Sequence, residues 1–287
     1  MDRTADDYRM LTAEALRAAV GGDGEARVLR LAPAFQGLPD TAHGGSVLAV
    51  FDHAAGLVGS RRIEGRFLKR VPLEAPLRLR ARPGPAGADL ELVDETAVLV
   101  RGRVLPAADA GVVDVGPPDP AAPALPISRT CFACGTDNPL GLRVQLRADD
   151  VAVGGRWTPP PGFDDGGGSL ATVALTTLLD EAAFWLGALA TGEAGMTTDL
   201  RVTLHADARG SASITIAGAR AATRPRADDA RYWDTALAAR DADGRLVASA
   251  AITFVAVRGT ARRLIAGLLA VNAPDLLRRV FPAYTTV

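Results

Sequence analysis

The chain has 287 residues, which is enough for two domains of ordinary size or one large domain. Apolar residues make up 48% of it and can form a substantial core, while 32 basic and 33 acidic residues leave a formal net charge of −1. This balance argues against a dedicated surface for nucleic acid or for an anionic membrane, and 5% of aromatic residues is too few for a base-stacking platform.

The composition favours a bacterial protein of the cytoplasm. The abundance of alanine, arginine, glycine and aspartate is typical of a high-GC bacterial genome. The first ten residues, MDRTADDYRM, are too charged for a signal peptide. The longest apolar run, residues 182–190, falls well short of a membrane-spanning length. Only Cys131 and Cys134 are present, which excludes a disulfide framework.

The N-terminal part of the chain predicts helices and strands in a definite order. Helical spacing covers residues 8–20, and apolar alternation over residues 26–34 predicts a strand. The polar loop FQGLPDTA then leads into a predicted helix at residues 43–58, which has little polar surface and should be buried. Further strands are predicted at residues 62–71, 77–81, 89–93 and 97–105.

Residues 106–128 have the composition of a linker. They contain six prolines and several small residues without any periodicity. Such a segment favours an extended backbone and should bury little. We therefore predict an N-terminal domain at residues 1–105 and a C-terminal domain at residues 129–287.

The C-terminal part repeats the order of the first. After CFACGTDNPLGL and the loop TPPPGFDDGGGS, a long apolar helix is predicted at residues 170–190. An amphipathic helix is expected at residues 260–271, and a hairpin turn at residues 241–244. Strands are predicted at residues 142–146, 151–157, 198–205, 211–217, 233–240 and 246–257. One central helix followed by four strands therefore occurs twice, which predicts an α+β fold with an antiparallel sheet around each helix.

The two central helices align with one another without a gap. FQGLPDTAHGGSVLAVFDHAAGLVG begins at Phe35, and FDDGGGSLATVALTTLLDEAAFWLG begins at Phe163. Asp52 falls on Asp180 in this alignment. The shared interval within the same order of elements indicates an internal duplication. The alternative is that two unrelated helices rich in alanine and leucine look alike through composition alone.

These motifs resemble those of the PaaI-like acyl-CoA thioesterases of the hotdog superfamily. The pattern similar to the central-helix signature of that family consists of Phe35-x-Gly, then His43-Gly44-Gly45, and finally Asp52, nine residues after the histidine. Further segments of hotdog proteins resemble FLKRVPLEAPLRLRA, CFACGTDNPLGL, LDEA and DADGRLVASAAITFV. The resemblance implies two tandem hotdog domains, each an antiparallel β-sheet wrapped around a central helix, paired as a pseudo-dimer.

The resemblance also implies an activity. It implies that the protein hydrolyses an acyl thioester with water, with a coenzyme A thioester as the substrate and no metal or redox cofactor. Such chemistry needs a hydrogen-bond donor for the carbonyl and a carboxylate that attacks or activates water. The resemblance implies that the Gly44 N–H is the donor, since a helix N-terminus offers free N–H groups and Gly45 keeps the approach open. The alternative is a turn that needs glycine for steric reasons.

The carboxylate is expected from the other half of the chain. Asp52 lies eight residues beyond Gly44, about 12 Å along the same helix, and cannot easily reach a carbonyl held there. Two hotdog units packed side by side bring in a neighbouring antiparallel helix. We therefore expect Gly44 to meet Asp180, with Glu181 beside it, and Asp52 to meet the start of the second helix.

The second copy of the site is expected to be degenerate. His43, Gly44 and Gly45 align with Ala171-Thr172-Val173, and a β-branched pair removes the close approach that glycine permits. The sequence therefore predicts one intact site. A structural role remains the alternative for each aspartate, because a buried carboxylate needs hydrogen bonds in either case.

Further residues are candidates for binding the substrate. Phe35 and Gln36 precede the histidine, where related thioesterases often carry an asparagine or glutamine. Arg66 and Lys69 belong to a basic run that suits the phosphates of coenzyme A, or else forms a solvated strand edge. His43 is a candidate general base, as in hotdog dehydratases.

The two cysteines have three interpretations. Cys131-x-x-Cys134 has half of a zinc-ribbon spacing, but there is no second pair, and His53 and His205 are distant in sequence. A zinc shared across a dimer and a redox pair remain open. The favoured interpretation is a tight turn that continues through Asn138.

Two other functions remain open. One is a hotdog hydratase or dehydratase that uses His43 and Asp180, and the other is a non-catalytic acyl-CoA binding protein. The sequence does not distinguish coenzyme A from an acyl carrier protein or identify the acyl chain. It predicts neither a nucleic-acid nor a membrane partner, and it is compatible with a homodimer of the double-domain chain.

Overall fold

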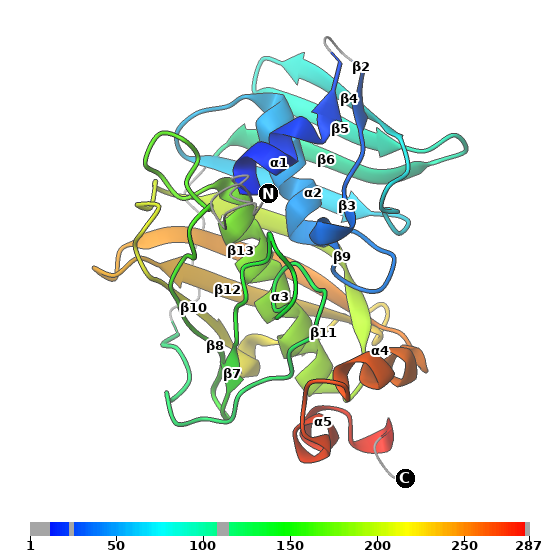
Figure 1. The fold of residues 1–287 in the computed structure, drawn as a ribbon, viewed down its shortest axis with the longest axis vertical. Helices are drawn as coiled ribbons and strands as arrows, with labels where there is room; N and C mark the ends of the chain where they lie inside the picture. The colour runs from blue at the N-terminus through cyan, green and yellow to red at the C-terminus, as the bar shows by residue number, and fades with distance from the viewer. Residues whose placement is uncertain (1–11, 23–25, 108–114, 285–287) are drawn as a thin grey trace, which may run out of the picture.

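The computed structural model describes residues 12–22, 26–107 and 115–284 (Figure 1). Its strands form a single antiparallel sheet in the order β1-β2-β4-β5-β6-β3-β9-β13-β12-β10-β8-β7, and β11 pairs with β12. The strands are β1 (Val20–Gly21), β2 (Ala26–Leu29), β3 (Arg61–Phe67), β4 (Leu77–Gly84), β5 (Gly87–Val93), β6 (Val98–Pro106), β7 (Arg147–Ala148), β8 (Ala152–Trp157), β9 (Gly195–Leu204), β10 (Ile214–Ala219), β11 (Arg224–Pro225), β12 (Tyr232–Arg240) and β13 (Leu246–Ala256).

The two halves of the chain join through β3 and β9. These strands pair antiparallel from Arg61 opposite Leu204 to Arg66 opposite Asp199. Strands β1 to β6 lie on one side of this junction and β7 to β13 on the other. Each half is therefore an antiparallel sheet of its own, and the two sheets continue into one another edge to edge.

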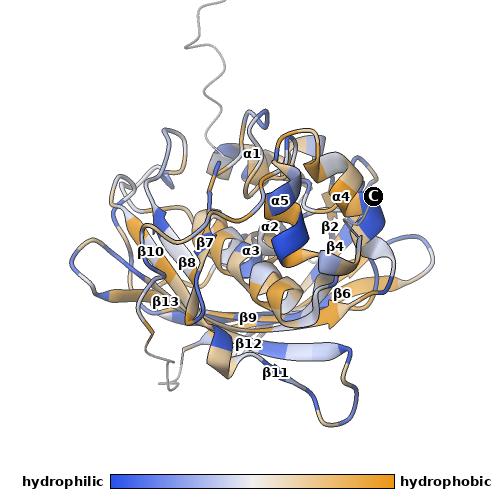
Figure 2. Cartoon of the chain, turned by 90° about the horizontal axis from the view of Figure 1, so that it is seen from below, coloured by the Kyte–Doolittle hydropathy of each residue, from blue (hydrophilic) through white to orange (hydrophobic). Residues whose placement is uncertain are grey.

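The helices lie on one face of the sheet (Figure 2). The α-helices are α1 (Thr12–Ala18), α2 (Gly44–Ala55), α3 (Thr172–Thr191), α4 (Thr260–Leu268) and α5 (Pro274–Val280), and the 3-10 turns are η2 (Pro33–Phe35), η3 (Arg220–Ala222) and η4 (Pro282–Tyr284). Helix α2 packs on the sheet of the first half and α3 on that of the second (Figure 1). The prediction of an α+β fold with one central helix in each half is confirmed.

The two central helices touch at their N-terminal halves. A Cβ added to Gly45 would lie 2.5 Å from the Thr177 Cα, so only glycine permits this approach. The Thr176 hydroxyl donates a hydrogen bond of 2.8 Å to the Gly45 carbonyl across the contact. This crossing sets the start of α2 against the middle of α3.

Several predicted boundaries shift in the structure. The helix predicted at residues 43–58 ends at Ala55, because Gly56 takes a left-handed conformation with φ 65°. The strand predicted at residues 26–34 stops at Leu29, before the 3-10 turn that begins at Pro33. Of the helix predicted at residues 8–20, residues 8–11 lie outside the described residues. The terminal amphipathic helix ends at Leu268, and a second helix follows at Pro274.

The prediction of a strand at residues 142–146 was wrong. Leu142, Val144 and Leu146 alternate because all three are buried, but their backbone bonds to neighbouring loops. The Leu142 and Val144 N–H groups donate to the carbonyls of Phe132 and Ala133. The alternation of apolar residues therefore results from burial here and does not indicate strand pairing.

The segment at residues 115–128 is packed, contrary to the expectation that it buries little. The Leu125 side chain is fully buried, and its N–H donates to the Leu146 carbonyl at 2.8 Å. Ile127 exchanges two hydrogen bonds with the Asn272 side chain. Extended proline-rich backbone thus lies along the second half, and the domain boundaries stay a prediction.

Helix α3 is long and apolar enough to cross a membrane by length and composition. Its longest uninterrupted apolar run is the predicted one at residues 182–190, because Asp180 and Glu181 precede it in the helix. However, 83% of its apolar window is buried inside the protein. Its apolar residues form the core of the second half.

Candidate active site

The first turn of α2 lies against the carboxylate of Asp180 in the middle of α3. The Gly45 N–H donates a hydrogen bond of 3.0 Å to Asp180 Oδ2. A Cβ on Gly44 would lie 2.7 Å from the same oxygen, so a side chain there would displace the carboxylate. Among the described residues, none accepts a hydrogen bond from the Gly44 N–H. A free donor and a carboxylate from the two halves therefore lie side by side.

His43 caps α2 and lies between two carboxylates. Its Nδ1 is 3.0 Å from Asp180 Oδ2, and its Nε2 is 3.7 Å from Glu181 Oε2. Burial alone would lower the pKa of His43, but the charge of Asp180 and hydrogen bonds with Asp180 and Glu181 outweigh it and hold the pKa well above its usual value. The Gly45 N–H lies 3.2 Å from His43 Nδ1, so the cap of α2 and Asp180 Oδ2 meet at the same N–H group.

The two acidic residues of α3 differ in how they are held. Glu181 Oε1 accepts a hydrogen bond of 2.9 Å from the Trp185 indole N–H, which fixes this side chain. Asp180 Oδ1, in contrast, is buried and has no hydrogen-bond partner among the described residues. An unpartnered buried carboxylate oxygen is costly, which is typical of a group retained for function.

A cavity of about 120 Å³ adjoins His43, Asp180 and Glu181. Both halves contribute to its wall, and so do Leu264 and Leu268 of α4, which sequence patterns did not indicate. The predicted binding residue Lys69 also borders it. The remaining lining residues are Gly37, Leu38, Thr41, Ala42, His43, Gly44, Phe67, Arg70, Val71, Ser128, Cys131, Cys134, Asp180, Glu181, Phe184, Trp185, Gly195, Met196 and Thr197.

Phe35 and Gln36, expected to bind substrate, do not line the cavity. Phe35 is 1% exposed and packs against Phe132, with ring centroids 5.1 Å apart. The Gln36 side-chain amide donates to the Thr130 hydroxyl at 2.8 Å, and the main-chain carbonyl of Gln36 accepts from the Phe132 N–H at 2.6 Å. The structure thus assigns both residues to the joint between the two halves.

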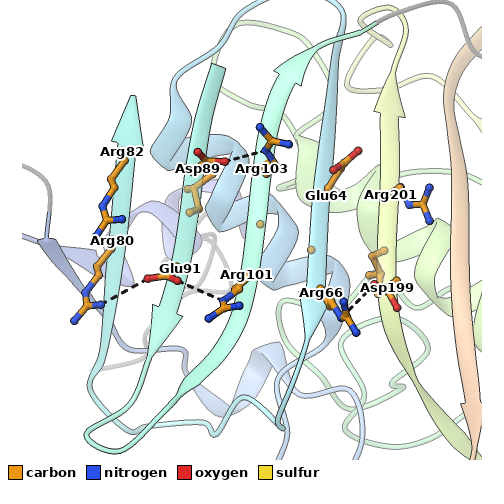
Figure 3. Close-up of a pocket in the computed structure, with 14 residues that line it drawn as sticks. Glu64, Arg66, Arg80, Arg82, Asp89, Glu91, Arg101, Arg103, Asp199 and Arg201 are labelled. Carbon is orange, nitrogen blue, oxygen red and sulfur yellow. Dashed lines mark hydrogen bonds and ion pairs between the residues drawn. The ribbon is translucent and has the colours of Figure 1, made fainter. Parts of the chain in front are cut away.

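Arg66, expected to bind substrate, does not line the cavity beside Asp180. Its side chain is on the outer face of the sheet, 72% exposed and 3.9 Å from Asp199 (Figure 3). Side chains alternate along a strand, and the neighbouring Gly65 and Phe67 face inward. Arg66 lines a charged hollow of about 510 Å³ on the outer face, where arginines alternate with acidic residues in cross-strand pairs.

The equivalent aspartate of the first half has a different environment. Arg61 holds Asp52 from Nε at 2.5 Å and from Nη2 at 2.7 Å. The Thr172 hydroxyl, at the start of α3, donates to Asp52 Oδ2 at 2.8 Å. Asp52 thus lies at the start of the second helix, neutralised and fully bonded.

The loop that contains Cys131 and Cys134, here called the cysteine loop, lies next to His43 and Glu181. The turn interpretation is confirmed, since the Gly135 N–H donates to the Cys131 carbonyl at 2.9 Å and the Asn138 amide bonds Ala34 and Thr130. Cys131 and Cys134 are free, buried thiols on the cavity wall. A hydrogen bond from Cys134 lowers the pKa of the Cys131 thiol despite its burial. The sequence analysis named only His53 and His205 as possible further metal ligands, whereas the fold brings His43 close to Cys131.

Comparisons with known proteins bear on the fold. No protein-family model matches the sequence, and no curated protein matches it. A hot dog fold protein from Alicyclobacillus acidocaldarius superposes with a TM-score of 0.54 at 14% identity, over 90% of this chain and 100% of its own. The chain has a double hotdog fold. Its two hotdog halves pair through β3 and β9, which confirms the predicted pseudo-dimer.

Two further solved structures share the double hotdog fold. Acyl-CoA thioesterase II TesB2 from Mycobacterium marinum has a TM-score of 0.55 at 11% identity, over 86% of this chain and 98% of its own. GphF dehydratase 1 has a TM-score of 0.53 at 18% identity, over 83% of this chain and 96% of its own. At these identities the likeness concerns the fold, and both kinds of enzyme occur on it.

Proposed function

We propose that this double hotdog protein hydrolyses an acyl-CoA thioester at the site shared by α2 and α3. The observation that carries the proposal is the juxtaposition of the free Gly44 N–H with Asp180, whose Oδ1 has no partner among the described residues. A thioester carbonyl bound to the Gly44 N–H would place its carbon beside this carboxylate.

The start of α2 would stabilise the transition state. The carbonyl oxygen accepts a hydrogen bond from the Gly44 N–H and lies at the positive end of the helix dipole. Negative charge builds on this oxygen when water adds to the carbonyl carbon. A preorganised backbone donor in a buried site is among the most effective means of stabilising such an oxyanion.

Asp180 would act as the general base. Its Oδ1 takes a proton from a water molecule while the water oxygen bonds to the carbonyl carbon. The tetrahedral intermediate then collapses, the carbon–sulfur bond breaks, and the proton passes from Asp180 to the leaving thiolate. His43 and the Gly45 N–H hold Oδ2 in place, which leaves Oδ1 to turn toward the cavity. Neither a metal nor a redox cofactor takes part in these steps.

A hydratase or dehydratase reaction is the second candidate. That chemistry needs proton transfer at the α- and β-carbons, which lie beyond the carbonyl, and His43 beside Asp180 is the pair that would perform it. The position of Asp180 against the first turn of α2 favours the carbonyl carbon as the point of attack. A protein that binds acyl-CoA without turnover is the third candidate.

The surroundings suggest how the substrate would lie. Lys69 and Arg70, at the cavity, suit the phosphates of coenzyme A. The apolar side chains of Phe184, Trp185 and Leu268 suit the acyl chain. We further infer that the enzyme works in the bacterial cytoplasm, with neither nucleic acid nor a membrane as partner. We also infer that two copies of the chain associate as a homodimer.

A substrate panel tests the proposal. The protein is incubated with acyl-CoA esters of increasing chain length, and free thiol is followed with a thiol-reactive dye. A parallel assay follows hydration of an enoyl-CoA. Thiol release supports hydrolysis, hydration without thiol release supports the second candidate, and binding without either product supports the third.

A further inference from the structure

Three potential metal ligands converge at one corner of the cavity. One ring nitrogen of His43, the Cys131 Sγ and a Glu181 carboxylate oxygen all lie within 4.8 Å of one another. The three side chains are buried and come from the N-cap of α2, the cysteine loop and α3. A nitrogen, a sulfur and an oxygen ligand that meet in this way are the donor types that zinc uses in proteins.

We propose that His43, Cys131 and Glu181 bind one thiophilic divalent cation of the Zn²⁺ class. All three residues line the cavity, so a fourth coordination position open to it would be accessible to water or to a ligand. Three protein ligands with one open position is the arrangement of zinc sites that exchange a water or a substrate. Binding releases a proton from the Cys131 thiol and one from His43 Nε2 to solvent.

The His43–Glu181 pair requires little rearrangement to bind an ion. Nε2 of His43 and Oε2 of Glu181 are 3.7 Å apart. Bond lengths of about 2.0–2.1 Å at tetrahedral angles separate two such ligands by about 3.4 Å. A movement of a few tenths of an ångström therefore brings this pair to bonding geometry.

The ligands are already oriented by a second layer of hydrogen bonds. His43 Nδ1 lies 3.0 Å from Asp180 Oδ2, so a carboxylate aims Nε2 at the ion. Glu181 Oε1 accepts from Trp185, which leaves Oε2 free for coordination. Metal-binding histidines nearly always have such a carboxylate or carbonyl on their other nitrogen. A histidine that merely filled the core would not need this arrangement.

The charges at the site also suit a dication. Asp180 and Glu181 are two buried carboxylates, and His43 is the group that lies within ion-pair distance of both. The two positive charges of a divalent ion would replace the two protons that Cys131 and His43 release, so binding leaves the net charge of the site unchanged. Because the ion takes Nε2 and leaves Nδ1 on Asp180, it is compatible with the hydrolysis proposed above but does not depend on it.

Cobalt titration tests the site independently of any enzymatic activity. The full-length protein is stripped with a chelator and titrated with Co²⁺, a coloured substitute for Zn²⁺. We expect one equivalent to produce a near-ultraviolet thiolate-to-cobalt charge-transfer band, and Zn²⁺ to remove it. Cys131→Ser should abolish the band, while Cys134→Ser, the matched control, should keep it. Asp180→Asn should weaken binding about 10- to 100-fold with the band retained.

Thermal unfolding provides a second readout that does not rely on colour. Zn²⁺ should raise the unfolding midpoint of the wild type and of Cys134→Ser, because binding to the folded state stabilises it. It should leave that of Cys131→Ser unchanged, with circular dichroism confirming that this variant folds. A wild type without a thiolate band overturns the proposal. A band that persists in Cys131→Ser, or vanishes in a folded Cys134→Ser, overturns the ligand set.

Discussion

Arg61 holds both carboxylate oxygens of Asp52, whereas one oxygen of the aligned Asp180 has no partner within the described part of the chain. The helix N-terminus of the other half lies beside Asp180. The duplicated aspartates have thus diverged. Asp52 stabilises the contact between the halves together with Thr172. Asp180 lies where a thioester carbonyl would be polarised.

Removal of Arg61 should destabilise the fold. In Arg61→Leu the buried carboxyl group of Asp52 loses its ion-pair partner, and such a loss typically costs about 3–5 kcal/mol. Chemical denaturation measures the change in the free energy of unfolding. Arg103→Ala is the control, since it breaks the exposed pair with Asp89 and should cost at most about 1 kcal/mol. Similar losses in the two variants would contradict a structural role for Asp52.

Gly44→Ala should impair hydrolysis more than folding. The added Cβ would lie 2.7 Å from Asp180 Oδ2 and displace the carboxylate from the carbonyl site. We expect kcat/KM to fall about 100-fold, in the range seen when an oxyanion donor is lost. Gly267→Ala is the matched control, because its Cβ meets nothing within 4 Å. Full activity in Gly44→Ala would show that the carbonyl binds elsewhere.

The pKa of His43 should depend on Asp180. The charge of Asp180 and its hydrogen bond raise this pKa against the effect of burial, which lowers it. In Asp180→Asn the negative charge is absent, so burial has more weight and the pKa of His43 should fall. An NMR titration of the imidazole C–H signals in chelator-treated protein measures it. An unchanged pKa would mean that Asp180 does not contact His43 in solution.

The site was predictable where it follows from local geometry. The helical rise alone separates Gly44 from Asp52 and demands a carboxylate from the other half, which is where Asp180 lies. The outward position of Arg66 also follows from strand alternation once Gly65 is placed inward. The fold class needed only the repeated order of one helix and several strands.

Other features depend on contacts between distant segments. The cysteine loop reaches His43 through the Phe132 N–H and the Gln36 carbonyl, a pairing that no periodicity encodes. The packing of residues 115–128 is equally non-local, since a proline-rich composition says nothing about a neighbouring surface. The cover that α4 provides over the cavity required a tertiary position for the C-terminal segment.

The central claim is that hydrolysis occurs at one site shared between the halves, with Asp180 as its base. The most direct test compares kcat for thiol release from an acyl-CoA in Asp180→Asn and Asp52→Asn, two isosteric changes at aligned positions. We predict a loss of about 100-fold or more in Asp180→Asn, and activity close to wild type in Asp52→Asn. Equal losses, or a larger loss in Asp52→Asn, would contradict the account.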